Sequence, residues 1–456
     1  TDRGSAARSR SALARSFRSL PEPGDPFLGR RGQLTQITQW VNRDRASTDT
    51  RPTVVVLHGP SGSGRTTLAV RAAHEMRELF RGACLVDLRG QSVDPLPTRD
   101  ALLHLMNRLG APRDQLLFRE NAGRGADPAQ LRRLAERYQQ HLAGVPVVVI
   151  LDDATDAEQV ATLIPQRSDS LVLVTAAEPL PLDPSLPASV HQLPLAALDS
   201  DSAEELLRAS VPDGGTVPGP YDAASWQRIT ELCDGRPLLL RLAGSALAAR
   251  TPAQLVEDLD AYGPPGSLDA AERALRLRYA DQSEPARRLL RRLAIAGRAS
   301  FGVRAAAALL DTGEEEAARP LNELVAAGLL HHVRGSRYRL HELVRRFARA
   351  RMYDEETDED RSAAQERLIR SYAELADTVI RLVDGKTSTR ADLLPAAAGG
   401  HGFRSLEAAL RWLDDETSFI TATLRYADER VDRQAMQHLL GALCDYCLLR
   451  GDLYRL

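Results

Sequence analysis

Gly59-Pro-Ser-Gly-Ser-Gly64-Arg65-Thr66-Thr67 is the stretch that decides the fold; it follows the apolar run Val54–Leu57 and leads into a helical pattern over 68–80. A strand, a glycine-rich loop and a helix with the spacing G-x-x-x-x-G-basic-Thr are typical of a phosphate-binding loop. Glycines let backbone N–H groups curl around phosphate oxygens, and the helix N-terminus adds unpaired donors and a positive dipole end. The stretch therefore predicts nucleotide binding.

The side chains of this loop have separate expected roles. The hydroxyl of Thr66 is placed to ligate Mg²⁺. Arg65 stands where lysine is usual, and its planar guanidinium is bulkier than an ammonium group. Lys386 is the only lysine in the chain, so Arg65 agrees with a general use of arginine. The nucleotide-binding candidates here are Gly59, Ser61, Gly62, Ser63, Gly64, Arg65, Thr66 and Thr67.

A second motif is the apolar run from Val145 that ends in Asp152 and Asp153. Continuous apolar runs are typical of strands buried on both faces of a parallel sheet. Carboxylates at the C-terminal end of such a strand lie at the crevice where α/β sheets bind ligands. We therefore predict Asp152 as a Mg²⁺ partner through water and Asp153 as the residue that positions an attacking water. These two are the catalytic candidates.

Strands alternating with helices predict a doubly wound parallel sheet, the P-loop NTPase architecture, over the first part of the chain. From Asp201 the pattern becomes helical, and 262–267 reads as a linker. Helices that end in short segments at 329–333 and 338–340 predict a winged helix. The expected domains are a linker at 1–25, a nucleotide-binding domain at 26–197, a small helical domain at 198–265, a winged helix at 266–352 and a helical arm at 353–456.

The helical arm is expected to lead into TPR-like repeats, the first units of an α-solenoid, although no clean internal repeat is visible. Its predicted helices lie at 363–383, 405–412, 419–427 and 435–450.

Composition narrows the class of protein. The 456 residues carry a formal net charge of −3, which gives no global field for nucleic acid or membrane. No run of about 18 apolar residues predicts a membrane span, and no signal peptide is visible, so we expect a cytoplasmic protein. Four cysteines give no disulfide framework, and Cys444 and Cys447 are expected to pack in a core. The chain begins without methionine, so a preceding segment is expected.

The ordered motifs resemble the NB-ARC branch of the STAND signalling NTPases, as found in large bacterial SARP-type regulators with tetratricopeptide repeats. The resemblance covers about 26–350. Its motifs, besides the phosphate loop, are Phe27-Leu-Gly-Arg30, Leu-Asp152-Asp153, Val-Thr175, Gly235-Arg-Pro-Leu238 and Leu340-His341-Glu342. It implies a switch with an ADP-held closed state, an ATP-held open oligomer and an output in transcription.

The resemblance also implies roles for single residues. Phe27, Leu28, Gly29 and Arg30 would line the adenine and ribose, Pro237 would pack on the base, and His341 would reach the β-phosphate. The arginine usual after the threonine of the fourth strand is replaced by Ala177, which together with Arg65 implies at most a slow ATPase. Expected partners are ADP or ATP with Mg²⁺, further copies of the chain, and an unknown effector through the helical arm.

Two other functions remain open. A DNA-binding transcription factor would act through the winged helix, whose end is rich in arginine from Arg334 to Arg351. The stretch expected to read DNA begins with Glu314-Glu-Glu316, which would repel phosphate, so nucleic acid is expected to bind through a domain outside this chain. The other alternative is a nucleotide-free scaffold that keeps the fold without the ligand.

Overall fold

The computed structural model describes residues 12–92, 94–112, 128–263, 269–297, 299–333, 336–384, 406–425, 427, 429 and 431–450. The chain divides into two compact units. The first comprises the chain up to Leu206 together with the four residues Gly235–Leu238, and the second comprises Leu207–Asp234 and nearly all of the chain from Leu239 onward. Each unit is described by itself.

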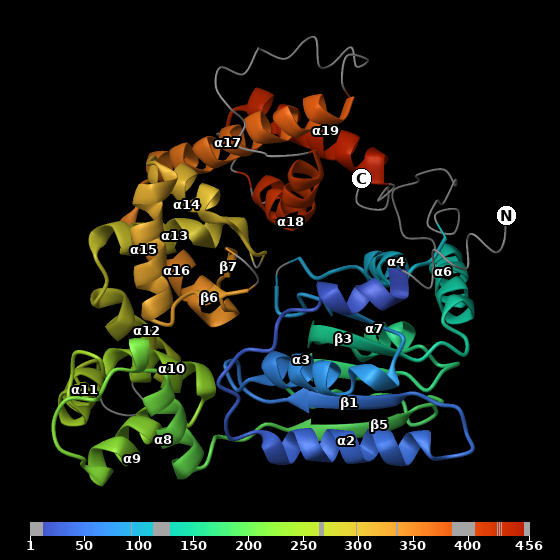
Figure 1. The fold of residues 1–456 in the computed structure, drawn as a ribbon, viewed down its shortest axis with the longest axis horizontal. Helices are drawn as coiled ribbons and strands as arrows, with labels where there is room; N and C mark the ends of the chain where they lie inside the picture. Colours follow the sequence, from blue (N-terminus) through green and yellow to red (C-terminus); the bar gives the residue numbers. More distant parts are fainter. Residues whose placement is uncertain are drawn as a thin grey trace. The chain divides into compact units, whose positions relative to one another are not determined.

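The first unit is built on a parallel sheet whose strands lie in the order β2-β3-β4-β1-β5. Figure 1 labels β3, β1 and β5 among them. The strands are β1 (Thr53–His58), β2 (Gly82–Asp87), β3 (Val147–Ala154), β4 (Leu171–Ala176) and β5 (Ser189–Pro194). All their pairings are parallel, so the carboxyl ends of β1 and β3 meet at one edge with β4 between them. The predicted doubly wound parallel sheet is confirmed.

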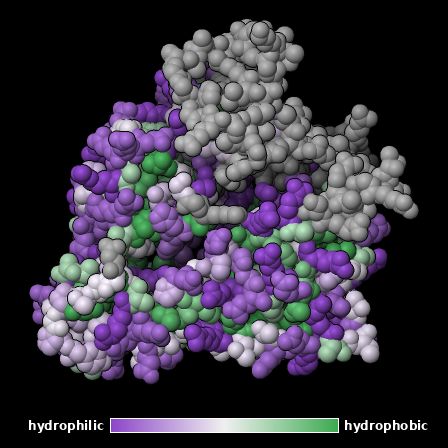
Figure 2. Space-filling view, in the orientation of Figure 1, coloured by the Kyte–Doolittle hydropathy of each residue, from purple (hydrophilic) through white to green (hydrophobic). Residues whose placement is uncertain are grey.

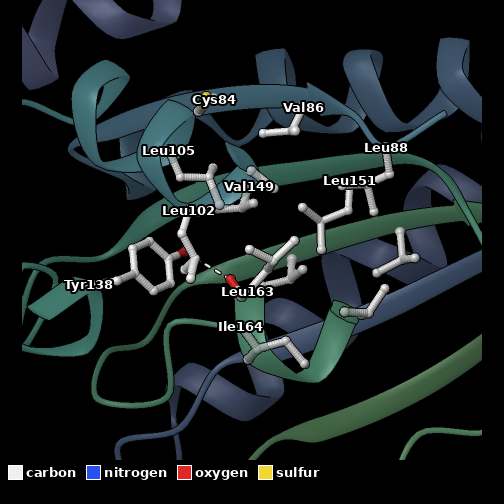
Figure 3. Close-up of a cluster of buried hydrophobic side chains, with 14 of the residues drawn as sticks. Cys84, Val86, Leu88, Leu102, Leu105, Tyr138, Val149, Leu151, Leu163 and Ile164 are labelled. Atoms are coloured by element: carbon white, nitrogen blue, oxygen red, sulfur yellow. Dashed lines mark hydrogen bonds between the residues drawn. The ribbon is translucent and has the colours of Figure 1, made fainter. Parts of the chain in front are cut away.

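Helices cover both faces of this sheet because its strands are apolar on both sides. Val54 and Val56 of β1 belong to one buried cluster, and Val55 and Leu57 belong to the other. The first cluster lies under α4 (Thr98–Arg108), α6 (Pro128–His141) and α7 (Ala157–Leu163), and the second under α2 (Arg31–Arg45) and α3 (Arg65–Glu75). In the first cluster the buried Tyr138 hydroxyl donates to the Leu163 carbonyl at 2.8 Å (Figure 3).

Residues 12–20 correct the linker predicted for the start of the chain. They form helical turns that include η1 (Phe17–Ser19). Leu13 belongs to the cluster on one face of the sheet, whereas Phe17 and Leu20 belong to the cluster on the other. Ser16 Oγ accepts a hydrogen bond from Ala83 N of β2 at 2.8 Å. The sequence also allows a short basic helix over 11–20, and the apolar residues of that segment pack into both clusters. Residues 1–11 lie outside the described part.

The second unit is helical apart from one short hairpin in its described residues. Its helices are α9 (Ala223–Leu232), α10 (Pro237–Ala246), α11 (Pro252–Asp260), α12 (Ala270–Ala280), α13 (Glu284–Leu293), α14 (Val303–Leu310), α15 (Glu314–Ala326), α16 (Glu342–Glu355), α17 (Asp358–Asp384), α18 (Leu406–Arg425) and α19 (Arg433–Arg450). The hairpin pairs β6 (His331–His332) with β7 (Tyr338–Arg339) in antiparallel fashion. Helix α8 (Ser200–Ala209) runs across the division between the units, and so does α10, whose first two residues belong to the first unit.

Two helices of this unit differ from the sequence prediction. Helix α11 was not expected, although Thr251 and Gln254 form a capping box at its start, a recognisable signal. The separate helices predicted at 405–412 and 419–427 are one continuous helix, α18, because nothing between them breaks the helical pattern.

A buried ion pair joins the hairpin of the second unit to α18. Arg337 Nη1 donates to Glu416 Oε1 at 2.5 Å, and Tyr372 Oη donates to Glu416 Oε2 at 2.9 Å. The same guanidinium also donates to the hydroxyl and the carbonyl of Ser300. The hairpin arginine is therefore neutralised by a carboxylate of the same unit.

The coloured surface in Figure 2 carries hydrophilic side chains over much of its area, with apolar side chains between them. Among the described residues, no helix combines the length and the apolar character needed to span a bilayer.

Candidate functional site

The glycine-rich loop lies between β1 and α3 and depends on its glycines for shape. Gly62 and Gly64 have φ values of 85° and 90°, a region in which side chains beyond glycine are strained. A Cβ at Gly59 would lie 2.9 Å from the Leu195 carbonyl oxygen, so only glycine fits the close approach of these two chain segments. Gly64 is the N-cap of α3, and the loop therefore ends at a helix N-terminus.

Three consecutive carbonyls of this loop are held from outside. Arg236 donates to the Ser61 carbonyl through Nε at 3.1 Å and Nη2 at 2.6 Å. Leu238 N donates to the Gly62 carbonyl at 3.1 Å, and Arg30 Nη2 donates to the Ser63 carbonyl at 3.2 Å. In a planar trans peptide, the N–H that follows a carbonyl points the opposite way. Holding these carbonyls outward therefore directs the N–H groups of Gly62 and Gly64 into the loop.

Arg30 is itself buried, and its Nη2 also donates to the Ala196 carbonyl at 2.7 Å. Burial lowers the pKa of the Arg30 guanidinium below its usual value, and the nearby Asp199 carboxylate opposes that shift. Within the described residues, the buried Nε of Arg30 and the buried Oγ of Ser63 have no hydrogen-bond partner. Ser63 Oγ lies 3.4 Å from the position that a Cβ on Gly59 would take, so this buried hydroxyl stands close to the backbone of the loop.

Asp152 connects the loop to the sheet. Its Oδ1 accepts from Thr66 Oγ1 and from Thr175 Oγ1, both at 2.7 Å, and the residue is 2% exposed. The β3–β4 register shifts between Leu151 and Ala154, so the carboxylate sits at a bulge, a feature that often redirects a side chain. Thr66 and Asp152, which the sequence assigns separately to Mg²⁺, are thus joined by a direct hydrogen bond, and their roles toward the metal stay predictions.

Asp153 has a left-handed backbone, with φ of 57°, at the same bulge. Its N–H donates to Thr175 Oγ1 at 2.9 Å, and its carbonyl accepts from Gly90 N at 2.8 Å. The Thr175 hydroxyl therefore holds both residues: it donates to the Asp152 carboxylate and accepts from the backbone N–H of Asp153. A Cβ on Gly90 would lie 2.5 Å from the Asp153 carbonyl oxygen, which makes glycine necessary there as well.

Arg65 departs from the geometry of a phosphate-neutralising lysine. Its Nη1 donates to the carbonyl of Ala176, at the end of β4. Ala177, the next residue, carries no cation, and its carbonyl accepts from Gly59 N at 3.2 Å. The basic side chain of the loop thus contacts the β4 end, where the resemblance leads one to expect an arginine.

The remaining candidates of the first unit are Phe27, Leu28, Gly29, Thr67 and Pro237, of which Pro237 is shown beside the loop. Pro237 Cγ lies 3.9 Å from a Cβ built on Gly64, so its ring stands beside the start of α3. The Phe27 ring is partly buried against the core, and Arg71 Cζ lies 5.1 Å from the centroid of that ring. Gly29, with φ of 67°, is closed in by Leu198 and Ser202. Leu28 is half-buried and Thr67 is exposed.

His341 belongs to the second unit and is the N-cap of α16. Its Nδ1 accepts from Leu343 N at 3.2 Å, so in a neutral ring Nε2 carries the proton. The contact of His341 with the β-phosphate of a bound nucleotide stays a prediction.

Two residues of this site had no role in the sequence prediction. Arg236 and Thr175 were noticed only as parts of motifs, and the structure makes them the main holders of the loop and of the carboxylate pair. The sequence holds one signal for Arg236, because glycine before it and proline after it are typical of a tight turn. In the structure Gly235 has a left-handed φ of 56°. The contact of Arg236 with the Ser61 carbonyl could not be predicted, because it depends on how the folded chain brings the two segments together.

Comparisons with known proteins agree with this geometry. A family model described as AAA ATPase domain matches residues 26–174. Regulatory protein AfsR of Streptomyces coelicolor is 31% identical over 428 residues, which is 89% of this chain and 41% of that protein. Regulatory protein AfsR of Streptomyces griseus is 30% identical over 436 residues, 93% of this chain and 43% of that protein. The chain thus spans about two fifths of the length of the curated relatives it matches.

Solved structures give weaker likenesses. Cdc6p of Pyrobaculum aerophilum has a TM-score of 0.37 at 14% identity, covering 75% of this chain and 97% of that one. The ORC1 protein of Aeropyrum pernix, solved in complex with DNA, has a TM-score of 0.34 at 16% identity, covering 71% and 93%. TM-scores of this size do not establish a common fold. The loop, the sheet order and the match over 26–174 agree with a P-loop NTPase-like fold, in a chain that is similar to the regulatory protein AfsR.

Proposed function

We propose that this chain is the switch part of a regulator, which binds ADP in a closed state and opens and self-associates with ATP, in the manner of STAND proteins. The observation that supports it most is the loop at 59–67, whose carbonyls are held outward so that N–H groups turn inward, and which leads into the Thr66–Asp152 hydrogen bond. Similarity to the regulatory protein AfsR supports an output in transcription.

The residues fit a magnesium nucleotide. Thr66 Oγ1 and Asp152 Oδ1 are oxygen atoms of the kind that Mg²⁺ prefers as ligands, and they lie 2.7 Å apart. When bound, Mg²⁺ would neutralise phosphate charge, with Thr66 as a ligand and Asp152 acting through water. Asp153 would orient the attacking water. We propose slow turnover, because Arg65 donates to the Ala176 carbonyl and Ala177 offers no cation.

We further propose that α13 to α15 and the β6–β7 hairpin form a winged helix. The bridge between Phe301 and Tyr338 supports it, since it adds a third extended segment beside the hairpin. The hairpin arginine Arg337 is neutralised by Glu416, and α15 starts with three glutamates, so this unit is poorly suited to hold DNA phosphates. Nucleic acid would bind through a domain outside this chain, and α17 to α19 would begin a TPR-like arm that receives an effector.

The proposed function is tested by binding and turnover together. Purified protein is denatured and its supernatant chromatographed for ADP or ATP, and nucleotide-free protein is titrated with each by calorimetry in the presence of Mg²⁺. We expect heat with both nucleotides and phosphate release well below one per minute, against about 10 per second for a typical enzyme. No heat and no retained nucleotide would favour the scaffold alternative, and rapid phosphate release would contradict slow turnover.

We propose that His341 is a latch, which donates to the β-phosphate of ADP and so favours the closed state. The variant His341→Asn tests it. Asparagine is as good an N-cap, so α16 keeps its first turn, but the imidazole donor is lost. A charge-assisted bond to a phosphate contributes about 1.5–3 kcal/mol, so we expect ADP affinity to fall by about tenfold or more. The variant should also self-associate more readily with ATP in light scattering. Unchanged ADP affinity and unchanged compactness in small-angle scattering would remove the latch.

A further inference from the structure

The turn Gly235–Leu238 is bound to the phosphate loop more extensively than its length suggests. It donates hydrogen bonds to two successive carbonyls of the loop, those of Ser61 and Gly62. Residue Arg236 is 8% exposed, and its side chain makes two of these bonds. The turn belongs to the first compact unit, while the residues before and after it belong to the second.

The turn is also fixed from its other side. Leu198 N donates to the Gly235 carbonyl at 2.9 Å, and a Cβ on Gly235 would lie 2.8 Å from Ala197 Cβ. A left-handed glycine wedged against 197–198 therefore sets the place from which Arg236 reaches Ser61. Pro237, next to Arg236, begins α10 and contributes no N–H donor of its own.

We propose that Arg236 is a positioning residue for the phosphates of the bound nucleotide, a proposal that rests on the proposed function. By holding the Ser61 carbonyl outward, its guanidinium keeps the N–H of Gly62 directed into the loop. Affinity for the diphosphate group then depends on docking of the turn. By linkage, a bound diphosphate favours the docked turn to the same extent.

Loss of Arg236 should affect the binding of the phosphates and not the binding of the nucleoside. The Ser61 peptide belongs to the phosphate loop, so loss of Arg236 should weaken ligands that carry phosphates and spare adenosine. A role limited to stability would weaken both ligands alike or neither. Arg45 provides a matched control, because its Nη1 also donates to one backbone carbonyl of the first unit, that of Asp169 at 3.0 Å.

The experiment titrates ADP and adenosine into the full chain and into Arg236→Leu, Arg236→Lys and Arg45→Leu by calorimetry. For Arg236→Leu we expect ADP affinity to fall by about 10–100-fold, as for loss of a hydrogen bond to a charged group, and adenosine affinity to stay within about twofold. Lysine can donate to the Ser61 carbonyl, so the ADP affinity of Arg236→Lys should lie between that of the parent and that of Arg236→Leu. Amide hydrogen exchange of 61–64 without nucleotide should quicken in Arg236→Leu and not in Arg45→Leu.

Equal ADP affinity in Arg236→Leu and the parent, or an equal loss for ADP and adenosine, would overturn the proposal. If Arg236→Leu does not fold, the Arg236→Lys protein decides it by the same ratio of ADP to adenosine affinity. A parent that binds neither ligand would overturn the proposed function instead. In that case unchanged exchange at 61–64 in Arg236→Leu would also overturn the positioning role.

Discussion

Asp152→Asn is expected to lower Mg²⁺-dependent ATP affinity by about 10–100-fold, the range typical for residues that support a metal from its outer shell. Asparagine keeps an Oδ1 acceptor for the hydroxyls of Thr66 and Thr175, so both hydrogen bonds of the carboxylate survive. What disappears is the negative charge that would act on the cation. Binding of ADP without metal should therefore change by no more than about twofold.

Calorimetry with ATP and Mg²⁺, and with ADP and a chelator, measures both quantities on one protein. Asp156→Asn is the matched control, because Asp156 also follows β3 but caps α7, a role that asparagine fills equally well. Asp152→Ala is less informative, since it leaves two hydroxyls, one of them buried, without their acceptor. An equal loss with and without metal in Asp152→Asn would mean that the carboxylate has only a structural role.

Arg291→Leu is expected to destabilise the second unit by about 3–5 kcal/mol, the cost of breaking a buried ion pair from one side. The guanidinium donates to Glu356 at 2.9 Å, to Glu355 at 2.9 Å and to the Tyr279 hydroxyl at 2.6 Å. Side-chain exposure is 6% for Arg291 and 5% for Glu356, so in the variant the buried Glu356 carboxylate would keep only its ion pair with Arg292, at 3.0 Å, of these two cations. Burial and the hydrogen bond to Glu355 raise the pKa of Tyr279 to about 12, so the phenol stays a donor.

Urea denaturation followed by circular dichroism measures this loss of stability. The control is Arg287→Leu on the same helix, because Arg287 pairs with Glu284 at 3.2 Å with 35% of its side chain exposed. Exposed pairs contribute about 0–1 kcal/mol, so the control should unfold close to the parent. Equal midpoints for both variants would show that the network around Arg291 is dispensable.

The elements of the first unit were predictable because their signals are local. The apolar runs of β1 and β3, the glycine spacing and the Asp152–Asp153 pair can each be read within a few residues. The strand order was not predictable in detail, because it depends on how distant segments pair. For the same reason Thr66 and Asp152 could be assigned to one site, whereas the contact of Arg236 with Ser61 could not.

In the second unit, local signals failed where packing decides. The gap between the helices predicted at 405–412 and 419–427 contains the charged residue Glu416. In the structure that carboxylate is buried against Arg337 and Tyr372, so the helix continues through it. A buried charge with distant partners cannot be distinguished from a surface charge in the sequence alone.

Strand β2 is an edge strand, and the segment around Ser16 wraps over that edge. An uncovered edge offers unpaired backbone groups to another chain, which is how sheet proteins aggregate. A protein shortened to begin at residue 26, where the family match starts, would lose the acceptor for Ala83 N and the side chains of Leu13, Phe17 and Leu20 from both core clusters. The smallest soluble form of the nucleotide domain therefore has to begin upstream of the family boundary, at or before residue 12.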